Sequence, residues 1–223
     1  MTAPNSDSTE KVADATLTES KKSTKMPVAV AITGASGGKY ALRLLAQLLH
    51  AGEQVYLMIS QAGLMVLAME EGLKLSNRPK EIQKRLIDYF QCEPNQLQVF
   101  GEQDWLAPPA SGSAKLKGMV IIPCTTGTLG AIAAGVSNCL INRSADVCLK
   151  EKKPLIIVVR ETPFSSIHLE NMLRLSQAGA TIMPANPGFY HHPETIMDII
   201  DFMVARVLDH LGVPQQLLEE WGK

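Results

Sequence analysis

The sequence has no excess of charge of either sign and no long hydrophobic run. Its 223 residues carry 21 lysines and arginines against 22 aspartates and glutamates, which gives a formal net charge of −1. A chain with this balance has no global attraction to nucleic acid or to an anionic membrane surface. No apolar stretch approaches the ~20 residues that a membrane-spanning helix requires. With 46% hydrophobic residues, the composition indicates a globular protein with one sizeable core.

Patterns that bind metals or form disulfides are also missing. The four cysteines show neither a Cys-x-x-Cys pair nor zinc-ligand spacing. They indicate reduced thiols in a reducing compartment, and we expect a cytoplasmic protein. The histidines lack metal-ligand spacing, and there is no Asp-rich element that would hold magnesium against a diphosphate. We therefore expect no metal at the functional site.

The first 25 residues differ in character from the rest of the chain. Residues 1–25 are polar, and their lysines and acids balance, which is typical of a disordered leader. They lack the apolar segment of a signal peptide, and their acids and lack of arginine argue against a transit peptide. We exclude residues 1–25 from the fold and expect a single α/β domain over residues 26–223.

Short β-rich runs alternate with helical periodicity through that domain. The pattern predicts strands at residues 28–33, 55–59, 97–100, 119–122, 154–159 and 181–183. It predicts helices at residues 40–50, 61–71, 79–90, 129–136, 141–152, 167–178 and 194–211. Pro123 is expected to end the fourth strand, because proline cannot donate a ladder hydrogen bond. The alternation predicts a three-layer, Rossmann- or flavodoxin-like fold with a mainly parallel sheet and helices on both faces.

Four of the predicted strand ends carry small, hydroxyl or charged residues that suit an anion. The carboxyl ends of parallel strands meet at one edge of a sheet, so we expect these turns to share one rim. Backbone N–H groups and the dipole at a helix start add attraction for phosphate. One phosphate-bearing ligand across the rim accounts for all four turns. Their residues are Gly34, Ala35, Ser36 and Gly37, then Ser60, then Thr125, Thr126, Gly127 and Thr128, and finally Arg160 with Glu161.

Each of these features has a purely structural alternative when it is taken alone. The turn at residues 34–39 is neither a P-loop nor a Gly-x-Gly-x-x-Gly motif, since Ser36 replaces the second glycine and Tyr40 replaces a magnesium-binding hydroxyl. It would serve equally as a tight strand-to-helix turn. Arg160 and Glu161 allow two interpretations. They form a surface ion pair that contributes little to stability, or Arg160 binds phosphate while the neighbouring carboxylate of Glu161 shuttles a proton. Single basic residues on the predicted helices are usually solvated.

Six segments together resemble the flavin prenyltransferases of the UbiX type. They are T-G-A-S-G at 33–37, P-P-A-S-G-S at 108–113, P-C-T-T-G-T-L at 123–129, N-R-S-A-D-V-C-L-K-E at 142–151, R-E-T-P at 160–163 and P-G-F-Y-H-H-P at 187–193. The combination of R-E-T-P with F-Y-H-x-P is the most specific part of this resemblance. The resemblance implies a homo-oligomer, a dodecamer built from trimers.

The resemblance also implies an activity, that of an alkyl-group transferase. A dimethylallyl group would pass from dimethylallyl monophosphate to N5 and C6 of reduced FMN. The product, prenylated FMN, would serve a partner decarboxylase of the ubiquinone pathway or of aromatic acids. FMN would be held by Gly34, Ala35, Ser36, Ser60, Thr125, Thr126, Gly127, Thr128 and Arg160. The donor would be met by Arg143, Lys150, Tyr190 and Arg206, some of them from a neighbouring subunit, with Trp105 flanking the prenyl group.

In this scheme Glu161 is expected to carry the proton needed for the second bond, and Ser36 to orient the flavin and relay protons. The cationic residues would neutralise the leaving phosphate without a metal, and Trp105 would stabilise allylic cation character through its π face. Two alternatives remain, an FMN-dependent cysteine decarboxylase of the same fold and a flavin carrier without chemistry. The first would need an Asn- and His-based site, whereas His168 and Asn171 lie on a predicted helix. A carrier would not need the cationic residues or Glu161.

Overall fold

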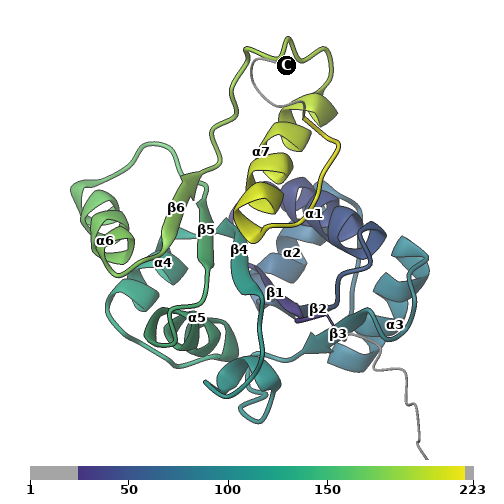
Figure 1. Ribbon diagram of the computed structural model, residues 1–223, viewed down its shortest axis with the longest axis horizontal. Coiled ribbons are helices and arrows are strands. Elements are labelled where there is room, and N and C mark those ends of the chain that lie inside the picture. Colours follow the sequence, from purple (N-terminus) through teal and green to yellow (C-terminus); the bar gives the residue numbers. More distant parts are fainter. Residues whose placement is uncertain (1–24, 219–223) are drawn as a thin grey trace, which may run out of the picture.

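Six parallel strands form one sheet that is covered by helices on both faces, in a computed structural model that describes residues 25–218 (Figure 1). The expected disordered leader, residues 1–25, therefore lies outside the described residues except for Lys25. The strands are β1 (Val28–Ile32), β2 (Val55–Ile59), β3 (Leu97–Phe100), β4 (Gly118–Cys124), β5 (Leu155–Val159) and β6 (Thr181–Pro184). The predicted three-layer α/β fold with a parallel sheet is confirmed.

The strand order is β3-β2-β1-β4-β5-β6, so the direction of winding reverses between β1 and β4. This is the Rossmann order, and the reversal creates a crevice beyond the carboxyl ends of the two central strands. Every residue of β1, β4 and β5 is buried. Burial on both faces explains why these strands are continuous apolar runs rather than alternating patterns.

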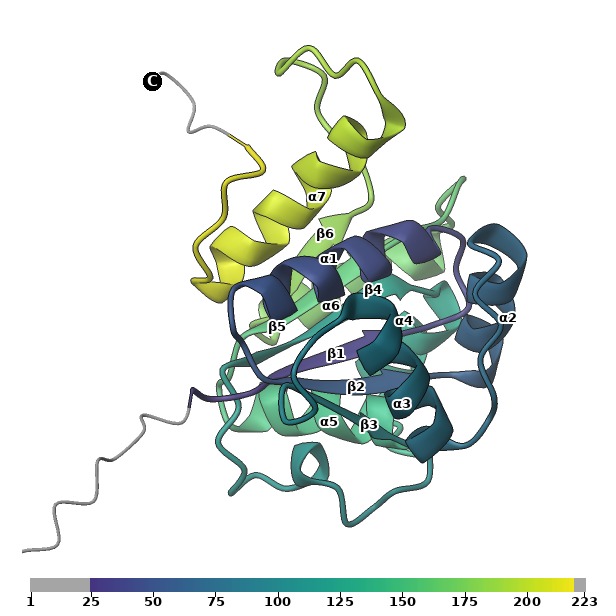
Figure 2. The same cartoon turned by 90° about the vertical axis from the view of Figure 1, so that its right-hand side faces the viewer.

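Two hydrophobic clusters, one on each face of the sheet, hold the helices in place. One cluster joins the sheet to α1 (Gly38–His50), α2 (Gln61–Glu70), α3 (Pro79–Phe90) and α7 (Ile196–Leu211). The other joins it to α4 (Thr126–Ala133), α5 (Leu140–Lys150) and α6 (Ser166–Gln177). Figure 2 shows α1 and α7 side by side on their face of the sheet. Among the described helices, none has the length and apolarity needed to cross a membrane.

The fourth strand does not end at Pro123, contrary to expectation. It continues to Cys124, which pairs with Val159 of β5 after a register shift that begins beyond Ile121. The peptide bond before Pro123 is cis. Proline lacks only the N–H, and its carbonyl still accepts hydrogen bonds from Thr33, through N at 3.3 Å and Oγ1 at 2.7 Å. The sheet therefore accommodates the missing N–H of Pro123 by a local register shift, and the strand continues beyond this residue.

The helix after β4 also differs from the prediction, because it begins three residues earlier, at Thr126, and ends at Ala133. The hydroxyl residues that were expected to precede the helix form its cap and first turn. Gly135, at φ 73°, follows its end. The last helix begins at Ile196 instead of residue 194, because Thr195 caps it by accepting a hydrogen bond from the N–H of Asp198. The other helix boundaries lie within two residues of their predicted positions.

Candidate functional site

The carboxyl ends of β1 and β4 are tied together by the side chain of Thr33. This residue is 2% exposed, and its Oγ1 donates to the carbonyl of Pro123 and accepts from the N–H of Thr125 at 2.9 Å. The turns after the two strands therefore leave the sheet at a fixed separation. Sequence analysis gave Thr33 no role, although it heads the T-G-A-S-G segment.

Two glycines allow the turn after β1 to pass closely under the start of α2. A Cβ on Gly34 would lie 2.4 Å from the Cβ of Ala62, so only glycine fits there. Gly37 has φ 114° and is the N-cap of α1, in a region that L residues rarely adopt. Between these glycines Ser36 is exposed.

This turn is contacted by a carboxylate that sequence analysis did not single out. Glu70, from the last turn of α2, accepts hydrogen bonds from the N–H groups of Gly37 at 2.8 Å and Gly38 at 3.1 Å. Burial alone would raise the pKa of Glu70, but hydrogen bonds from Ser36 and from these N–H groups, with the charge of Arg160, lower it. Ser36, Glu70 and Arg160 thus form one cluster, although they follow three different strands.

The turns after β2 and β4 use their hydroxyls as helix caps. Ser60 accepts from the N–H of Gly63 at 3.0 Å, and Thr125 accepts from the N–H of Thr128 at 3.1 Å. Thr125 Oγ1 also lies 2.9 Å from Thr128 Oγ1. A Cβ on Gly127 would meet nothing nearer than 4.0 Å, so the start of α4 is sterically open. A sterically open helix N-terminus is a ready site for an anion, because its first N–H groups and the helix dipole attract negative charge.

Arg160 and Glu161, at the end of β5, contact the end of β4 and the turn that follows it. The backbone N–H of Arg160 bonds to the carbonyl of Cys124 at 3.2 Å, while its Nε is buried and without a hydrogen-bond partner among the described residues. A buried guanidinium N–H without an acceptor is costly, so this atom fits a site for an anionic ligand. Glu161 accepts from the N–H of Thr162 at 3.0 Å and from Thr126 Oγ1 at 3.5 Å, which links the turns after β5 and β4.

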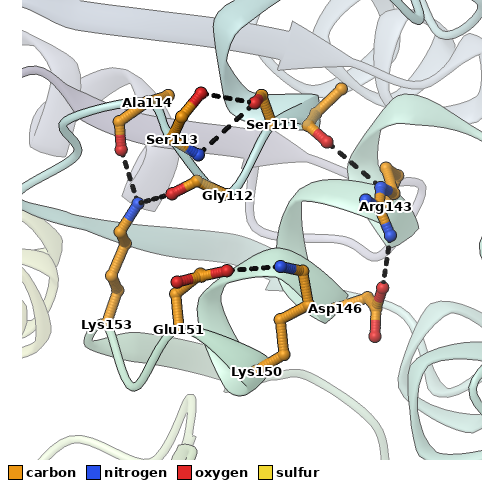
Figure 3. Close-up of polar contacts among 10 residues, drawn as sticks. Ser111, Gly112, Ser113, Ala114, Arg143, Asp146, Lys150, Glu151 and Lys153 are labelled. Carbon is orange, nitrogen blue, oxygen red and sulfur yellow. Dashed lines mark hydrogen bonds and ion pairs between the residues drawn. The ribbon is translucent and has the colours of Figure 1, made fainter.

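Arg143 and Lys150, which the resemblance assigns to the donor, both lie on α5 against the segment at residues 110–114 (Figure 3). Arg143 Nε donates to the carbonyl of Ala110 at 3.1 Å, and its Nη1 lies 2.7 Å from the carboxylate of Asp146. Lys150 forms an ion pair with Glu151. A Cβ on Gly112 would lie 2.8 Å from Lys150 Nζ, so the glycine lets the segment approach the ammonium group.

The other residues expected to meet the donor lie elsewhere in the chain. Arg206 is on α7, on the opposite face of the sheet from α5, and pairs with Asp209 at 2.9 Å. The half-exposed ring of Tyr190 lies in the loop before α7, with its centroid 5.6 Å from that of Phe202. Trp105 is 44% exposed in the loop after β3. Within one copy of the chain, Arg206 and Arg143 therefore lie on helices that cover different faces of the sheet.

Comparisons with known proteins show which family the chain belongs to. Residues 16–208 match the family described as Flavoprotein. The flavin prenyltransferase UbiX of Pseudomonas aeruginosa is 52% identical over 196 residues, which cover 88% of this chain and 94% of that protein.

Two solved structures extend the comparison to the fold. AnUbiX (PadA1), solved in complex with FMN and dimethylallyl pyrophosphate, is 34% identical, with a TM-score of 0.79 over 89% of this chain and 98% of the other. The dodecameric FMN-dependent UbiX-like decarboxylase from Escherichia coli O157:H7 is 36% identical, with a TM-score of 0.74 over 86% of this chain and 99% of the other. With these similarities along nearly the whole domain, the chain belongs to the UbiX-type flavin prenyltransferases of the Flavoprotein family.

Proposed function

We propose that this chain transfers a dimethylallyl group from dimethylallyl monophosphate to N5 and C6 of reduced FMN. The product, prenylated FMN, passes to a partner decarboxylase of the ubiquinone pathway or of aromatic acids. Residues 26–223 act as a single flavin-binding domain. Its place is the cytoplasm, in keeping with four unpaired cysteines, two of them buried.

The observation that carries this proposal is that Glu70 interacts with both Ser36 and Arg160, while Glu161, next to Arg160, contacts Thr126 in the first turn of α4. Glu70 already occupies the first N–H groups of α1, so the FMN phosphate is directed to the start of α4 and to Arg160. The buried Arg160 Nε supplies a donor that a phosphate oxygen satisfies. The isoalloxazine ring then extends toward Ser36. Gly34, Ala35, Ser60, Thr125, Thr126, Gly127 and Thr128 complete the flavin site.

When bound, reduced FMN supplies the nucleophilic N5 and the second bonding position at C6. The residues of the chain manage protons and orientation around it. Glu161 carries the proton, because its carboxylate lies at the junction of the turns after β4 and β5, within reach of Thr126. Ser36 orients the ring and relays protons, and Glu70 fixes Ser36 by accepting its hydrogen bond.

The donor phosphate lies between copies of the chain. Arg143 and Lys150 of one copy neutralise it against residues 110–114, and Tyr190 and Arg206 come from another copy. This division follows from the placement of α5 and α7 on opposite faces of the sheet. Fixed cations aimed at the leaving group stabilise the charge that develops there, so no metal is needed. The indole of Trp105 flanks the prenyl group.

Exposed apolar side chains support assembly into a homo-oligomer. On α6, Ile167 is 66%, Leu169 53% and Leu173 59% exposed, and on α2 Met69 is 81% exposed. The three exposed apolar side chains on α6 in particular are typical of a protein–protein contact. The dodecamer of the E. coli relative is the arrangement we propose for this chain.

The test is mass spectrometry of the flavin after incubation with reduced FMN and dimethylallyl phosphate. A prenyltransferase adds one five-carbon unit to FMN. A flavin carrier returns FMN unchanged, and so does a cysteine decarboxylase, which would instead release carbon dioxide from a cysteine-containing substrate. Unchanged FMN would therefore refute the proposal.

A further inference from the structure

The turn at residues 111–114, which faces Arg143 and Lys150, is held from its other side by a single ammonium group. Lys153 Nζ donates to the carbonyl of Gly112 at 3.3 Å and also to the carbonyl of Ala114 (Figure 3). The turn has no regular secondary structure and lies between the short 3-10 helix Pro108–Ala110 and β4. Its geometry therefore depends on contacts of this kind.

Lys153 reaches the turn because the chain reverses sharply after α5. Lys152 has φ 55°, and the N–H of Lys153 bonds to the carbonyl of Cys148 at 2.9 Å. This reversal places the side chain of Lys153 under the turn, where it is half-buried, while Lys150 and Lys152 stay exposed. A half-buried ammonium with two carbonyl acceptors is held more firmly than a solvated lysine.

Holding a carbonyl also sets the direction of the N–H in the same peptide plane. In a trans peptide the C=O of Gly112 and the N–H of Ser113 point in opposite directions. With the carbonyl on Lys153, this N–H points to Ser111 Oγ at 3.4 Å, and the two serine hydroxyls lie 2.8 Å apart. The N–H groups of Ser111 and Ala114 donate to the carbonyls of Pro108 and Ser111, so the paired serine hydroxyls are the groups that the turn can offer a ligand.

We infer that Lys153 is a positioning residue for the donor phosphate. It acts through the turn at residues 111–114, whose serine hydroxyls it fixes for a phosphate that Arg143 and Lys150 neutralise. Lys153 itself does not touch the phosphate. This inference rests on the proposed function, because it assigns the turn to the donor site.

The experiment compares Lys153→Met, which keeps the length of the side chain but removes its ammonium, with Lys153→Arg, which can still donate to both carbonyls. In Lys153→Met the KM for dimethylallyl phosphate is expected to rise about tenfold, as for the loss of one charge-assisted contact. The dissociation constant of FMN and the melting temperature should not change. Lys153→Arg should restore the wild-type KM.

Lys152→Met is the matched control, since it removes an adjacent, exposed lysine and should behave as wild type. An unchanged KM in Lys153→Met would overturn the inference. Equal losses of donor binding, FMN binding and melting temperature would also overturn it, because they would show a merely structural role. A Lys153→Arg variant as impaired as Lys153→Met would do the same.

Calorimetry with dimethylallyl phosphate separates this inference from the proposed function. If the wild type binds the donor but forms no product, the proposed reaction fails, and the dissociation constants of the three lysine variants still decide the role of Lys153. If the wild type binds no dimethylallyl phosphate, both the reaction and the positioning role are refuted.

Discussion

The guanidinium of Arg43 on α1 forms two hydrogen bonds to the carboxylate of Asp201 on α7, Nε to Oδ1 at 2.6 Å and Nη2 to Oδ2 at 2.8 Å. Both side chains are largely shielded, at 30% and 15% exposed. The hydrogen bond that Arg43 donates to Asp201 raises the pKa of Arg43, although partial desolvation opposes this. This paired contact fixes α7, which carries Arg206, against the sheet.

Replacing Arg43 with Met should therefore destabilise the protein by about 1–2 kcal/mol, between the values for exposed and for buried ion pairs. Arg78→Met is the control, because Arg78 pairs with Glu81 while 76% exposed and should cost at most about 0.5 kcal/mol. Denaturant unfolding at a fixed protein concentration measures both variants. Equal losses of unfolding free energy in Arg43→Met and Arg78→Met would show that the Arg43–Asp201 pair stabilises the protein no more than an exposed ion pair does.

Glu70 should give the protein a dependence of stability on pH. Its pKa is lowered in the folded protein, although burial opposes this, by hydrogen bonds from Ser36, Gly37 and Gly38. Its contribution to the free energy of unfolding is therefore fully present above the ordinary carboxyl pKa of about 4.3 and is lost as the pH falls through the lower folded value.

Glu70→Gln should consequently be less stable than the wild type at neutral pH, with the gap closing in acid below the ordinary carboxyl pKa. Urea unfolding of both proteins across this range gives the measurement. Glu93→Gln is the control, because Glu93 is exposed, lies in the loop before β3 and is not part of the cluster. A gap between wild type and Glu70→Gln that stays constant with pH would contradict the assigned hydrogen bonds.

Glu161→Gln should bind FMN with unchanged affinity and form little or no prenylated product. The amide can keep the hydrogen bonds to Thr162 and Thr126 but cannot carry a proton at neutral pH. Flavin fluorescence reports binding, and mass spectrometry reports product. Glu170→Gln, on the exposed surface of α6, should retain full activity. Full activity in Glu161→Gln would remove this residue from proton transfer.

Arg206→Ala should weaken use of the donor and leave FMN affinity alone, because α7 lies away from the flavin turns. In mixed assemblies a complete donor site should form again, because one copy supplies Arg206 and another supplies Arg143. Mixing subunits of Arg206→Ala with subunits of Arg143→Ala should restore activity to about a quarter of wild type, since random pairing leaves that share of sites intact. Mixed assemblies without recovered activity would show that both residues act from one copy.

Exhaustive chelation should leave the rate of prenylation unchanged. The leaving phosphate is neutralised by the arginines and Lys150, and these need no metal to hold their charge. The measurement compares initial rates with and without a chelator, followed by re-addition of magnesium. A strict requirement for magnesium would contradict the proposed role of these cations.

Several parts of the fold could be predicted from local sequence, and others could not. The apolar runs from Val28 and from Leu155 predict strands because a parallel strand is buried on both faces. The extension of β4 past Pro123 could not be predicted, because it depends on two contacts between distant residues. The carbonyl of Pro123 accepts a hydrogen bond from Thr33, and Cys124 pairs with Val159 of β5. The early start of α4 likewise follows from Thr125 serving as its cap.

The candidate site divides in the same way. The four turns at the carboxyl edge were predictable, because a parallel sheet brings the ends of its strands together. Glu70 was not, since on the sequence it is one charge among several near the end of a helix. Only the close approach of α2 at Gly34 carries it to the N–H groups of Gly37 and Gly38.

By itself the sequence determined the layers, the parallel sheet and the chemistry of its turns, because periodicity and turn residues act over short distances. The tertiary structure alone decided which charges meet. Arg143 and Arg206 appear equivalent on the sequence, yet the crossovers place α5 and α7 on opposite faces of the sheet. A charge acts strongly only over a few ångströms, and this is why we propose that the donor site combines residues of more than one copy of the chain.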